Sequence, residues 1–259
     1  MSFTGKSPSD TYKDILNIDN SNSGVDSTAR TVKTADGSSS AMALSDRALI
    51  VKSNTNNVNA LQVKNASDTA KFNVDTTNNQ VKALGTHVNT QYQYFGGSLI
   101  HSTGASAGYH TLLQEGHGWL DATATIAPVN MGNGTDPATS LTFSDNAMNY
   151  IKFFWYVPAN ISIDAVTSLE AADAAAGDTT RFHLFEYDYT DGSASVLTNG
   201  TLVAHSADQV NAGREQLYFN TWTIDSANIS SGKVILATHE SDTINSDYIT
   251  KVTVKYHLT

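Results

Sequence analysis

The segment HSTGASAGYHTLLQEGHGW, residues 101–119, contains the densest group of side chains that can bind a metal ion: His101, His110, Glu115 and His117. Imidazole nitrogens bind transition-metal ions, and on a threefold axis each of three identical chains would need to supply only one or two ligands. The spacing matches none of the established zinc motifs. Loop and interface histidines with ordinary hydrogen bonds are the alternative, so the sequence assigns neither a metal site nor a cofactor.

A second run with acidic side chains is FHLFEYDYTDGS, residues 182–193, which carries Glu186, Asp188 and Asp191. Hydrolysis of a glycosidic bond needs two carboxyl groups facing one cleft, and strand alternation puts Glu186 and Asp188 on one face. Calcium binding by Asp188 and Asp191 would lack the ligand run of an EF-hand loop, and Asp191 begins a typical hairpin-turn pair with glycine. A strand with one exposed face explains these acidic side chains without catalysis. The opposite face of the strand would carry Phe185, Tyr187 and Tyr189.

Two common catalytic motifs are absent from the chain. The sequence contains no Gly-x-x-x-x-Gly-Lys-Ser/Thr phosphate-binding loop and no His-Glu-x-x-His zinc motif. We therefore predict that the protein is not an enzyme.

Aromatic side chains are the remaining candidates for a functional surface, because a ring face can stack on a sugar. Two rings flank the glycine-rich segment and others fall on expected strands. The alternative is that most of them pack in the core or in an interface between copies of the chain. The candidate recognition residues are Tyr109, Trp119, Tyr187 and Tyr189, with Tyr218 and Trp222 on further strands.

Rings and charges both change in density near residue 90. Residues 1–90 contain three of the 23 Phe, Tyr and Trp residues, so a compact core is expected after residue 90. Residues 1–90 carry 9 Lys and Arg against 8 Asp and Glu, and residues 91–259 carry 6 against 17. An acidic domain repels phosphate backbones, so no nucleic acid is expected as a partner.

No run of residues is long and apolar enough for membrane insertion. The chain has no cysteine, so the fold has neither disulfides nor thiolate metal sites.

The N-terminal segment, residues 1–30, is expected to contain a short helix. In SPSDTYKDIL, Ser7 can cap the helix and Pro8 can occupy its first position. Tyr12, Ile15 and Leu16 would then lie on one face. A helix this short is not stable alone, so we expect it either to dock on a partner or to pack on its own chain.

Residues 31–90 show two-residue alternation in short repeated units. The segment ALIVK, residues 48–52, recurs as ALQVK, residues 60–64, and TNNVNAL, residues 55–61, recurs as TNNQVKAL, residues 77–84. Each strand has too few apolar side chains to offset its ordering entropy, so it needs neighbours from a solenoid or from other chains. We favour a homotrimeric stem over a solenoid or a disordered linker, with a core of Leu61, Val63, Phe72, Val74, Val81 and Leu84.

Residues 91–259 are expected to form an antiparallel β-sandwich, most simply a jelly roll, because many strand-like runs are separated by Gly and Asn turns. EAADAAAG, residues 170–177, is the one stretch compatible with a helical turn. The strand-like runs cover residues 92–101, 122–131, 140–143, 149–157, 161–169, 180–189, 195–204, 216–224, 233–238 and 248–257.

Three segments resemble structural proteins of tailed bacteriophages. FTGKSPSDTYKDILNIDNSNSG, residues 3–24, resembles the N-terminal module of appendage proteins, in which Gly-Lys-x-Pro precedes Tyr-Lys-Asp and an Asp-Asn-Ser-Asn turn. ALQVKNASDTAKFNVDTTNNQVKALG, residues 60–85, is similar to the stem repeats of phage fibres. The last part, from FFWYVP to KVTVKYHL, is similar to their C-terminal β-sandwich knobs.

The resemblance implies a homotrimeric virion fibre, assembled in the bacterial cytoplasm, whose N-terminus joins capsid or tail proteins. The anchor residues would be Pro8, Tyr12, Ile15 and Leu16. Our hypothesis for its function is attachment to the host surface, and the aromatic side chains named above would suit a surface polysaccharide as the ligand of the knob. The alternatives are a head fibre or decoration protein that covers or stabilises the capsid, and a depolymerase. The resemblance supplies no catalytic residues.

Overall fold

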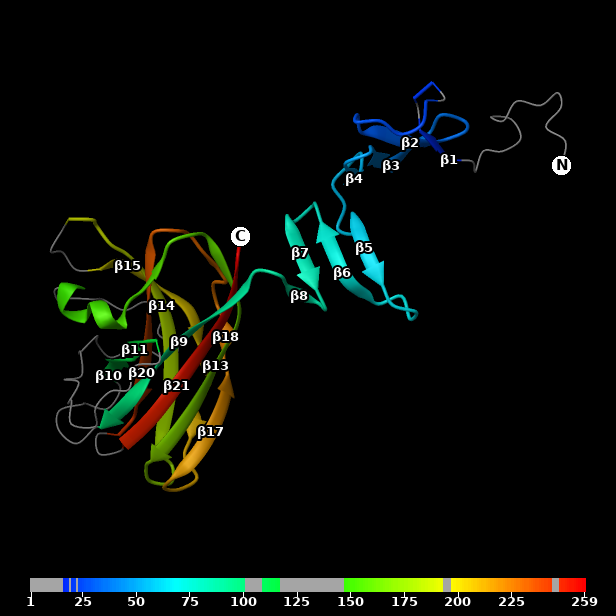
Figure 1. Ribbon diagram of the computed structural model, residues 1–259. Coiled ribbons are helices and arrows are strands. Elements are labelled where there is room, and N and C mark those ends of the chain that lie inside the picture. The colour runs from blue at the N-terminus through cyan, green and yellow to red at the C-terminus, as the bar shows by residue number, and fades with distance from the viewer. Residues whose placement is uncertain are drawn as a thin grey trace. The chain divides into compact units, whose positions relative to one another are not determined.

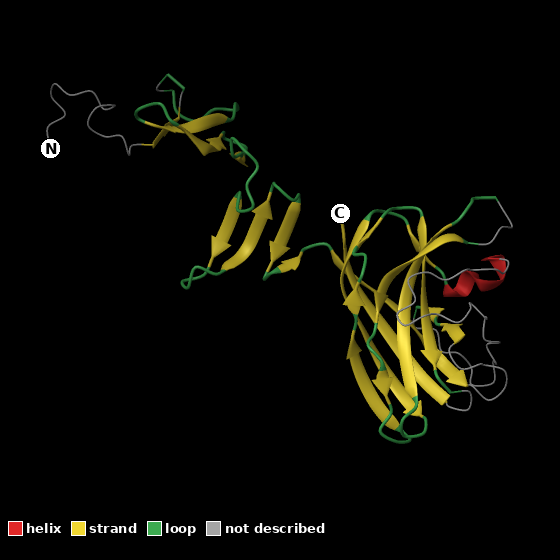
Figure 2. Cartoon of the chain, turned by 180° about the vertical axis from the view of Figure 1, so that it is seen from behind, coloured by secondary structure: helices red, strands yellow, loops and turns green. Residues whose placement is uncertain are grey.

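The structure is a computed structural model that describes residues 16–18, 20, 21, 23–100, 109–116, 147–192, 197–243 and 247–259 (Figure 1). Side chains at 98–100, 109 and 147–149 are outside this description. Every strand pair in the described part is antiparallel, and the one helical element there is the 3-10 segment η1 (Ala147–Phe153) (Figure 2). The prediction of an all-β protein is confirmed. The chain divides into an N-terminal unit, Met1–Val88, and a C-terminal unit, Asn89–Thr259.

In the described part of the N-terminal unit there are two sheets of four strands, and in each sheet the strands are neighbours in chain order. Short hairpins of this kind form when turn residues recur every few positions. The first sheet consists of β1 (Leu16–Ile18), β2 (Arg30–Thr34), β3 (Ser39–Leu44) and β4 (Leu49–Val51), and the second of β5 (Leu61–Lys64), β6 (Ala70–Asp75), β7 (Gln80–Ala83) and β8 (Thr86–His87).

Asn and Asp side chains close the hairpins of the second sheet. Asn65 Oδ1 accepts hydrogen bonds from the backbone N–H groups of Ser67 and Thr69, at 3.2 and 2.9 Å. Asp75 Oδ1 accepts from the N–H groups of Thr77 and Asn78, both at 2.9 Å. Short polar side chains that satisfy the turn backbone in this way favour turns over longer strands. The asparagine-rich composition of the repeats therefore sets their strand lengths.

One face of the β5–β8 sheet is apolar. The strand register places Leu61 opposite Val74, Val63 opposite Phe72, and Val74 opposite Val81, so these side chains share a face because directly paired residues point the same way. Leu61 and Val63 nevertheless remain 40% and 57% exposed. Within the described part of the N-terminal unit, Val32 is the one buried hydrophobic residue.

Leu84 does not belong to this apolar face. It follows the end of β7 with a φ of 52°, and its side chain is 77% exposed. A positive φ takes the residue out of the strand conformation, and the chain turns here into β8. This conformation sets Leu84 apart from the paired residues of the sheet, and its place in the core of a trimeric stem stays a prediction.

The end of the predicted N-terminal helix is a strand. Leu16 opens β1 and pairs with Thr34 of β2, so its backbone pairs across a sheet instead of along a helix, and its side chain is exposed. The prediction of helix at Leu16 is corrected accordingly. Pro8, Tyr12 and Ile15, the other predicted anchor residues, lie outside the described residues.

The described residues of the C-terminal unit form two sheets. Sheet I has the strand order β10-β20-β14-β15-β18, with β12 paired to β20 and β16 to β14. Sheet II has the order β11-β9-β21-β13-β17, with β19 paired to β13. The strands of sheet I are β10 (Tyr109–Leu112), β12 (Trp155–Val157), β14 (Thr179–Asp188), β15 (Thr198–His205), β16 (Gln209–Val210), β18 (Thr223–Ile224) and β20 (Lys233–Ser241); those of sheet II are β9 (Thr90–Ile100), β11 (Gln114–Glu115), β13 (Ile161–Asp173), β17 (Gln216–Thr221), β19 (Asn228–Ile229) and β21 (Asp247–Leu258).

The two sheets pack face to face around one core. Phe182 of sheet I stacks on Trp222 with ring centroids 5.6 Å apart, and Trp222 Nε1 donates to Ser168 Oγ of sheet II at 3.0 Å. Buried aromatic pairs with a satisfied indole N–H stabilise such a core. The other members of the core come from both sheets and include Phe95, Val166, Leu184, Ile235, Val252 and Val254.

The outer face of sheet I is also covered. Phe185 and Tyr187 of β14 are fully buried in a second apolar cluster, against which Phe153 of η1 packs. Figure 2 shows η1 as the red helix beside the sandwich. Residues 149–153, predicted as strand, are therefore 3-10 helix, and residues 170–173, predicted as a helical turn, belong to β13. The predicted strands at 122–131 and 140–143 lie outside the described residues.

Candidate functional site

A buried polar row crosses three neighbouring strands on the outer face of sheet I. His110 of β10 and Arg181 of β14 are both register partners of Glu240 on the strand between them, β20. Register partners carry their side chains on the same face, so the imidazole, the carboxylate and the guanidinium meet. His110 and Glu240 are 0% and 4% exposed. Three residues that are far apart in the sequence thus form one buried cluster.

The next row on the same face adds a second imidazole. His183 of β14 is the register partner of Thr238 on β20. The rings of His110 and His183 have centroids 4.7 Å apart, and His183 stacks on Phe185 at 5.6 Å with an interplanar angle of 15°. His183 is fully buried. We refer to His110, His183 and Glu240 as the imidazole–carboxylate cluster.

Metal-ligating atoms of the imidazole–carboxylate cluster converge. One ring nitrogen from each histidine and one carboxylate oxygen lie within 4.8 Å of one another. His110 Nε2 is 3.4 Å from Glu240 Oε2, and the geometry does not make a hydrogen bond at His110 Nε2. His110 Nδ1 lies 3.0 Å from Thr238 Oγ1.

Burial keeps both imidazoles of the cluster neutral. Removal from water lowers the pKa of His110 to about 4, and the charges of Arg181 and His239 act in the same direction. The same loss of hydration lowers the pKa of His183 to about 2, with further contributions from His110, His205 and Arg181. At neutral pH each ring therefore keeps one lone pair.

Arg181 connects the cluster to solvent. Its Nε and Nη2 donate to the two carboxylate oxygens of Asp208 at 3.0 and 3.1 Å, and its Nη1 lies 3.5 Å from Glu240 Oε1. A two-point contact of this kind fixes the plane of the guanidinium. Asp208 thus holds Arg181 so that its remaining nitrogen faces the buried carboxylate.

A separate imidazole–carboxylate pair lies between the two sheets. His239 Nε2 is 3.4 Å from Glu170 Oε2, and both side chains are completely buried. Thr180 Oγ1 lies 2.9 and 3.1 Å from the two oxygens of Glu170. Because residues alternate between the faces of a strand, His239 and Glu240 point to opposite sides of β20.

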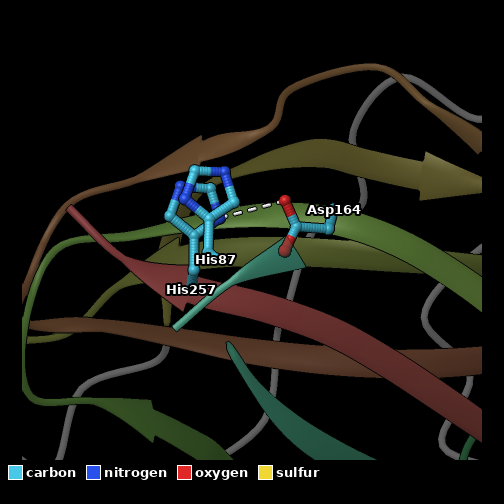
Figure 3. A group of neighbouring side chains, drawn as sticks. All are labelled: His87, Asp164 and His257. Carbon is cyan, nitrogen blue, oxygen red and sulfur yellow. Dashed lines mark hydrogen bonds and ion pairs between the residues drawn. The ribbon is translucent and has the colours of Figure 1, made fainter. Parts of the chain in front are cut away.

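A third pair joins two strands of sheet II. His257 Nδ1 of β21 lies 3.0 Å from Asp164 Oδ1 of β13 (Figure 3). His87, also drawn in Figure 3, belongs to the N-terminal unit. The pair ties the ends of the two strands together by a charge-assisted contact.

The predicted histidine segment is divided by the structure. His110 enters the imidazole–carboxylate cluster of sheet I, whereas Glu115 lies on β11 of sheet II and accepts from Gln93 Nε2 at 2.7 Å. His101 and His117 lie outside the described residues. Sequence analysis missed His183 and Glu240. The available signal was weak: each is a titratable residue within an expected strand, and β14 carries several other charged residues.

Of the aromatic residues predicted to form a recognition surface, the structure shows one to be buried and one to be exposed. Tyr187 is 0% exposed, so the prediction that it is a surface recognition residue is wrong; the cluster around η1 covers the face on which it lies. Tyr189 is 42% exposed and makes an edge-to-face contact with Tyr156 at 5.9 Å. The hydrogen bond to Tyr156 raises the pKa of Tyr189. The side chain of Tyr109 and the whole of Trp119 lie outside the described residues.

Tyr156 was not among the predicted residues, although a sequence signal existed. In the run Trp155, Tyr156, Val157 the outer two side chains are buried and the middle one is exposed. Strict alternation in an apolar run would have indicated an outward tyrosine. Of the two other rings, Trp222 is buried, and the hydroxyl of Tyr218 accepts a hydrogen bond from the N–H of Ala212 at 2.8 Å.

The acidic residues of β14 are held by structural contacts. Glu186 Oε1 accepts from Thr201 at 3.1 Å. Asp188 accepts from Asn199 Nδ2 at 2.8 Å and pairs with Lys233 Nζ at 2.6 Å, and these contacts hold the pKa of Asp188 below its usual range. A Gly-x-Ser-x-Gly pattern does occur in the chain, at residues 104–108, and lies outside the described residues.

Comparison with protein-family models and with curated proteins gives no match. Among solved structures, the chain is similar to a crystal structure of an aminopeptidase from the marine sediment archaeon Thaumarchaeota archaeon, at 7% sequence identity and a TM-score of 0.31. The similarity covers 72% of this chain and 40% of that one. Within the described residues, no helix combines the length and the apolar character needed to cross a bilayer.

Proposed function

We propose that this protein is a homotrimeric virion fibre protein of a bacteriophage that attaches the particle to the bacterial surface. In this proposal the N-terminal segment joins other virion proteins, residues up to about 90 form the stem, and the C-terminal unit is the outward knob. We propose no enzymatic activity. The single observation that carries the proposal is the apolar face of the β5–β8 sheet, which stays partly exposed within one chain.

A sheet of this size with an uncovered apolar face needs a partner. The apolar face is continuous across β5, β6 and β7, because Leu61 pairs with Val74 and Val74 pairs with Val81, and an exposed apolar patch marks a contact site. Three copies that turn these faces toward a common axis would bury them, which fits closed cyclic symmetry. Further apolar side chains of the N-terminal unit are exposed in one chain and would gain from the same assembly: Leu49, Ile50, Val51, Val58 and Val88.

The strand order of the C-terminal unit supports a jelly-roll knob. Eight of its described strands pair as nested hairpins, β9 with β21, β10 with β20, β13 with β17 and β14 with β15. The first and third pairs form sheet II, and the second and fourth form sheet I. A jelly roll of viral capsid and lectin domains divides eight strands between two packed sheets, and this likeness supports the proposal of a jelly-roll knob.

Two surfaces of the knob suit a fibre. The edge-to-face pair of Tyr156 and Tyr189 is exposed, and such rings suit recognition of a surface ligand such as a polysaccharide. The outer face of sheet II exposes large apolar side chains on adjacent strands, which suits contact between the knobs of a trimer. These side chains are Leu169, Leu217, Phe219 and Ile249.

Val63→Asp is expected to dissociate the trimer, because it places a charge on the apolar face of the stem. Light scattering of the purified full chain should give three times 27.7 kDa for the wild type and a smaller mass for the variant at micromolar concentration. Lys71→Gln, an equal change of charge at an exposed position of β6, is the matched control and should remain trimeric. A wild-type monomer would contradict the stem proposal.

Tyr156→Ala and Tyr189→Ala are expected to weaken binding of the labelled full chain to the bacteria that the particle infects. The loss should be at least about tenfold, equivalent to about 1.4 kcal/mol. Tyr92→Ala removes a similarly exposed ring from sheet II and should bind normally. The wild-type chain should also block adsorption of the particle to these bacteria. If all three variants bound the bacteria equally well, the tyrosine pair would not be the recognition site.

The same experiments separate attachment from the other candidate functions. If the chain does not bind cells, and particles that lack it burst more readily, a capsid decoration role replaces the proposal. Release of oligosaccharides from host surface material would instead indicate a depolymerase. The position of the protein in images of the intact particle distinguishes a head fibre from a tail fibre.

A further inference from the structure

We propose that His110, His183 and Glu240 bind one divalent transition-metal ion of the Zn²⁺ type inside the C-terminal unit. The residues come from three adjacent strands of sheet I, in the order β10-β20-β14. All three side chains are buried, and one ligand atom from each lies within 4.8 Å of the others. The site would lie within a single chain and does not depend on the proposed trimer.

The donor set and the spacing both suit zinc. Zinc binds imidazole nitrogen at about 2.0–2.1 Å and carboxylate oxygen at similar distances, with tetrahedral angles. Two such ligand atoms are then about 3.3 Å apart. His110 Nε2 and Glu240 Oε2 are separated by 3.4 Å, and His110 Nε2 makes no hydrogen bond within the described residues. This separation is the one that two ligands of a single tetrahedral ion would have.

Thr238 orients the first histidine. Its Oγ1 lies 3.0 Å from His110 Nδ1, and when Nδ1 donates to this hydroxyl the lone pair of the ring is on Nε2, the nitrogen that faces Glu240. Ligating histidines are fixed in this manner by a hydrogen bond at the nitrogen that does not bind the metal. Thr238 is therefore a positioning residue for the site.

The charges around the cluster also favour a cation. Both imidazoles are neutral near pH 7, because burial lowers the pKa of each. Glu240 and Asp208 carry two negative charges against the one positive charge of Arg181. Buried carboxylates require compensation by positive charge, and a divalent ion would supply it. Arg181 would then hold Glu240 Oε1 while Oε2 faces the ion.

The competing arrangement is a cluster of hydrogen bonds without metal. In that arrangement the Thr238 hydroxyl donates to His110 Nδ1, and the Nε2–H group points toward Glu240 at a poor angle. The two arrangements differ in a measurable way, because only the first predicts stoichiometric metal uptake. An ion joining three strands that are distant in sequence would also raise the stability of the C-terminal unit.

The test uses the full chain without a polyhistidine tag, stripped with a chelator and dialysed against Zn²⁺ or Co²⁺. We expect about one metal per chain by elemental analysis. Zinc at about 100 times its Kd should raise the unfolding midpoint by about 5–10 °C. Co²⁺ should give the intense visible absorption of a tetrahedral nitrogen–oxygen site. His110→Gln, His183→Gln and Glu240→Gln should each lower the affinity by more than about 100-fold, beyond what a change outside the ligand set causes.

His205→Gln is the matched control. His205 lies on β15, the next strand of sheet I, and pairs with Asp225 at 2.8 Å, so its removal should leave metal uptake unchanged. No stoichiometric uptake of either ion by the wild type would overturn the proposal, as would full uptake by all three ligand variants. If a ligand variant does not fold, the cobalt spectrum of the wild type decides: a weak octahedral spectrum rejects the site and an intense tetrahedral one supports it.

Discussion

Lowering the pH from 7 to 4 is expected to cost the metal-free C-terminal unit on the order of 5 kcal/mol of stability through His110 and His183 alone. Burial lowers the pKa of these side chains to about 4 and about 2 in the folded state, whereas an unfolded histidine titrates near its ordinary value of about 6.5. Between these values the unfolded chain binds protons that the folded chain does not. The stabilisation is therefore complete above about pH 7 and decreases as the pH falls.

Urea unfolding between pH 4.5 and 7.5 measures this effect, with a chelator present throughout. Tryptophan fluorescence reports on the C-terminal unit, since all three tryptophans lie after residue 90. Each histidine should contribute a slope of up to about 1.4 kcal/mol per pH unit below pH 6.5. His183→Gln should flatten the slope by this amount, and an unchanged slope in both His183→Gln and His110→Gln would refute the assignment.

Arg181→Met is expected to destabilise the metal-free C-terminal unit by about 3 kcal/mol at pH 7, because it removes a cation 3.5 Å from the buried carboxylate of Glu240. The Arg181 side chain is 20% exposed, which places the cost at the low end for a buried ion pair. Arg181→Lys should recover part of the stability, since lysine keeps the charge and lacks the two-point contact with Asp208.

Arg214→Met provides the control for this substitution. Arg214 is exposed, and loss of an exposed arginine should change the free energy of unfolding by less than about 0.5 kcal/mol. Urea unfolding at pH 7 compares the variants. If Arg181→Met were as stable as Arg214→Met, Glu240 would not depend on the guanidinium. Bound zinc should reduce the cost of Arg181→Met, because the ion also compensates the carboxylate.

Strand periodicity and turn chemistry were readable from the sequence because both are local. Alternation placed Leu61, Val63, Phe72, Val74 and Val81 on one face, and the register confirms this. The hairpins that Asn65 and Asp75 close were readable for the same reason, since these side chains bond to the backbone a few residues away.

The sequence-based prediction of exposure was wrong where a side chain is covered by segments that are distant in the sequence. Alternation correctly separated Tyr187 from Glu186, but a strand in isolation does not reveal that both of its faces are covered. Tyr187 is buried because η1 and neighbouring strands cover the outer face of sheet I. At Leu84 a positive φ interrupts the strand alternation, so its place in the stem core stays a prediction.

The imidazole–carboxylate cluster could not be predicted, because His110, His183 and Glu240 become neighbours only through the strand order β10-β20-β14. Nothing within a few residues of any of them specifies that order. The histidine-rich segment grouped His110 with Glu115, which lies in the other sheet; its other two histidines lie outside the described residues.

The sequence by itself determined an all-β chain with repeated short strands before residue 90 and a ring-rich core after it. These properties follow from side-chain alternation, turn residues and composition, which act over a few positions of the chain. Only the tertiary structure decided which strands are neighbours, which rings are exposed and which titratable groups meet. All three properties depend on how two sheets pack, and the paired strands of each sheet are far apart in the sequence. The close approach of His110, His183 and Glu240, and their burial, therefore exist only in the folded unit.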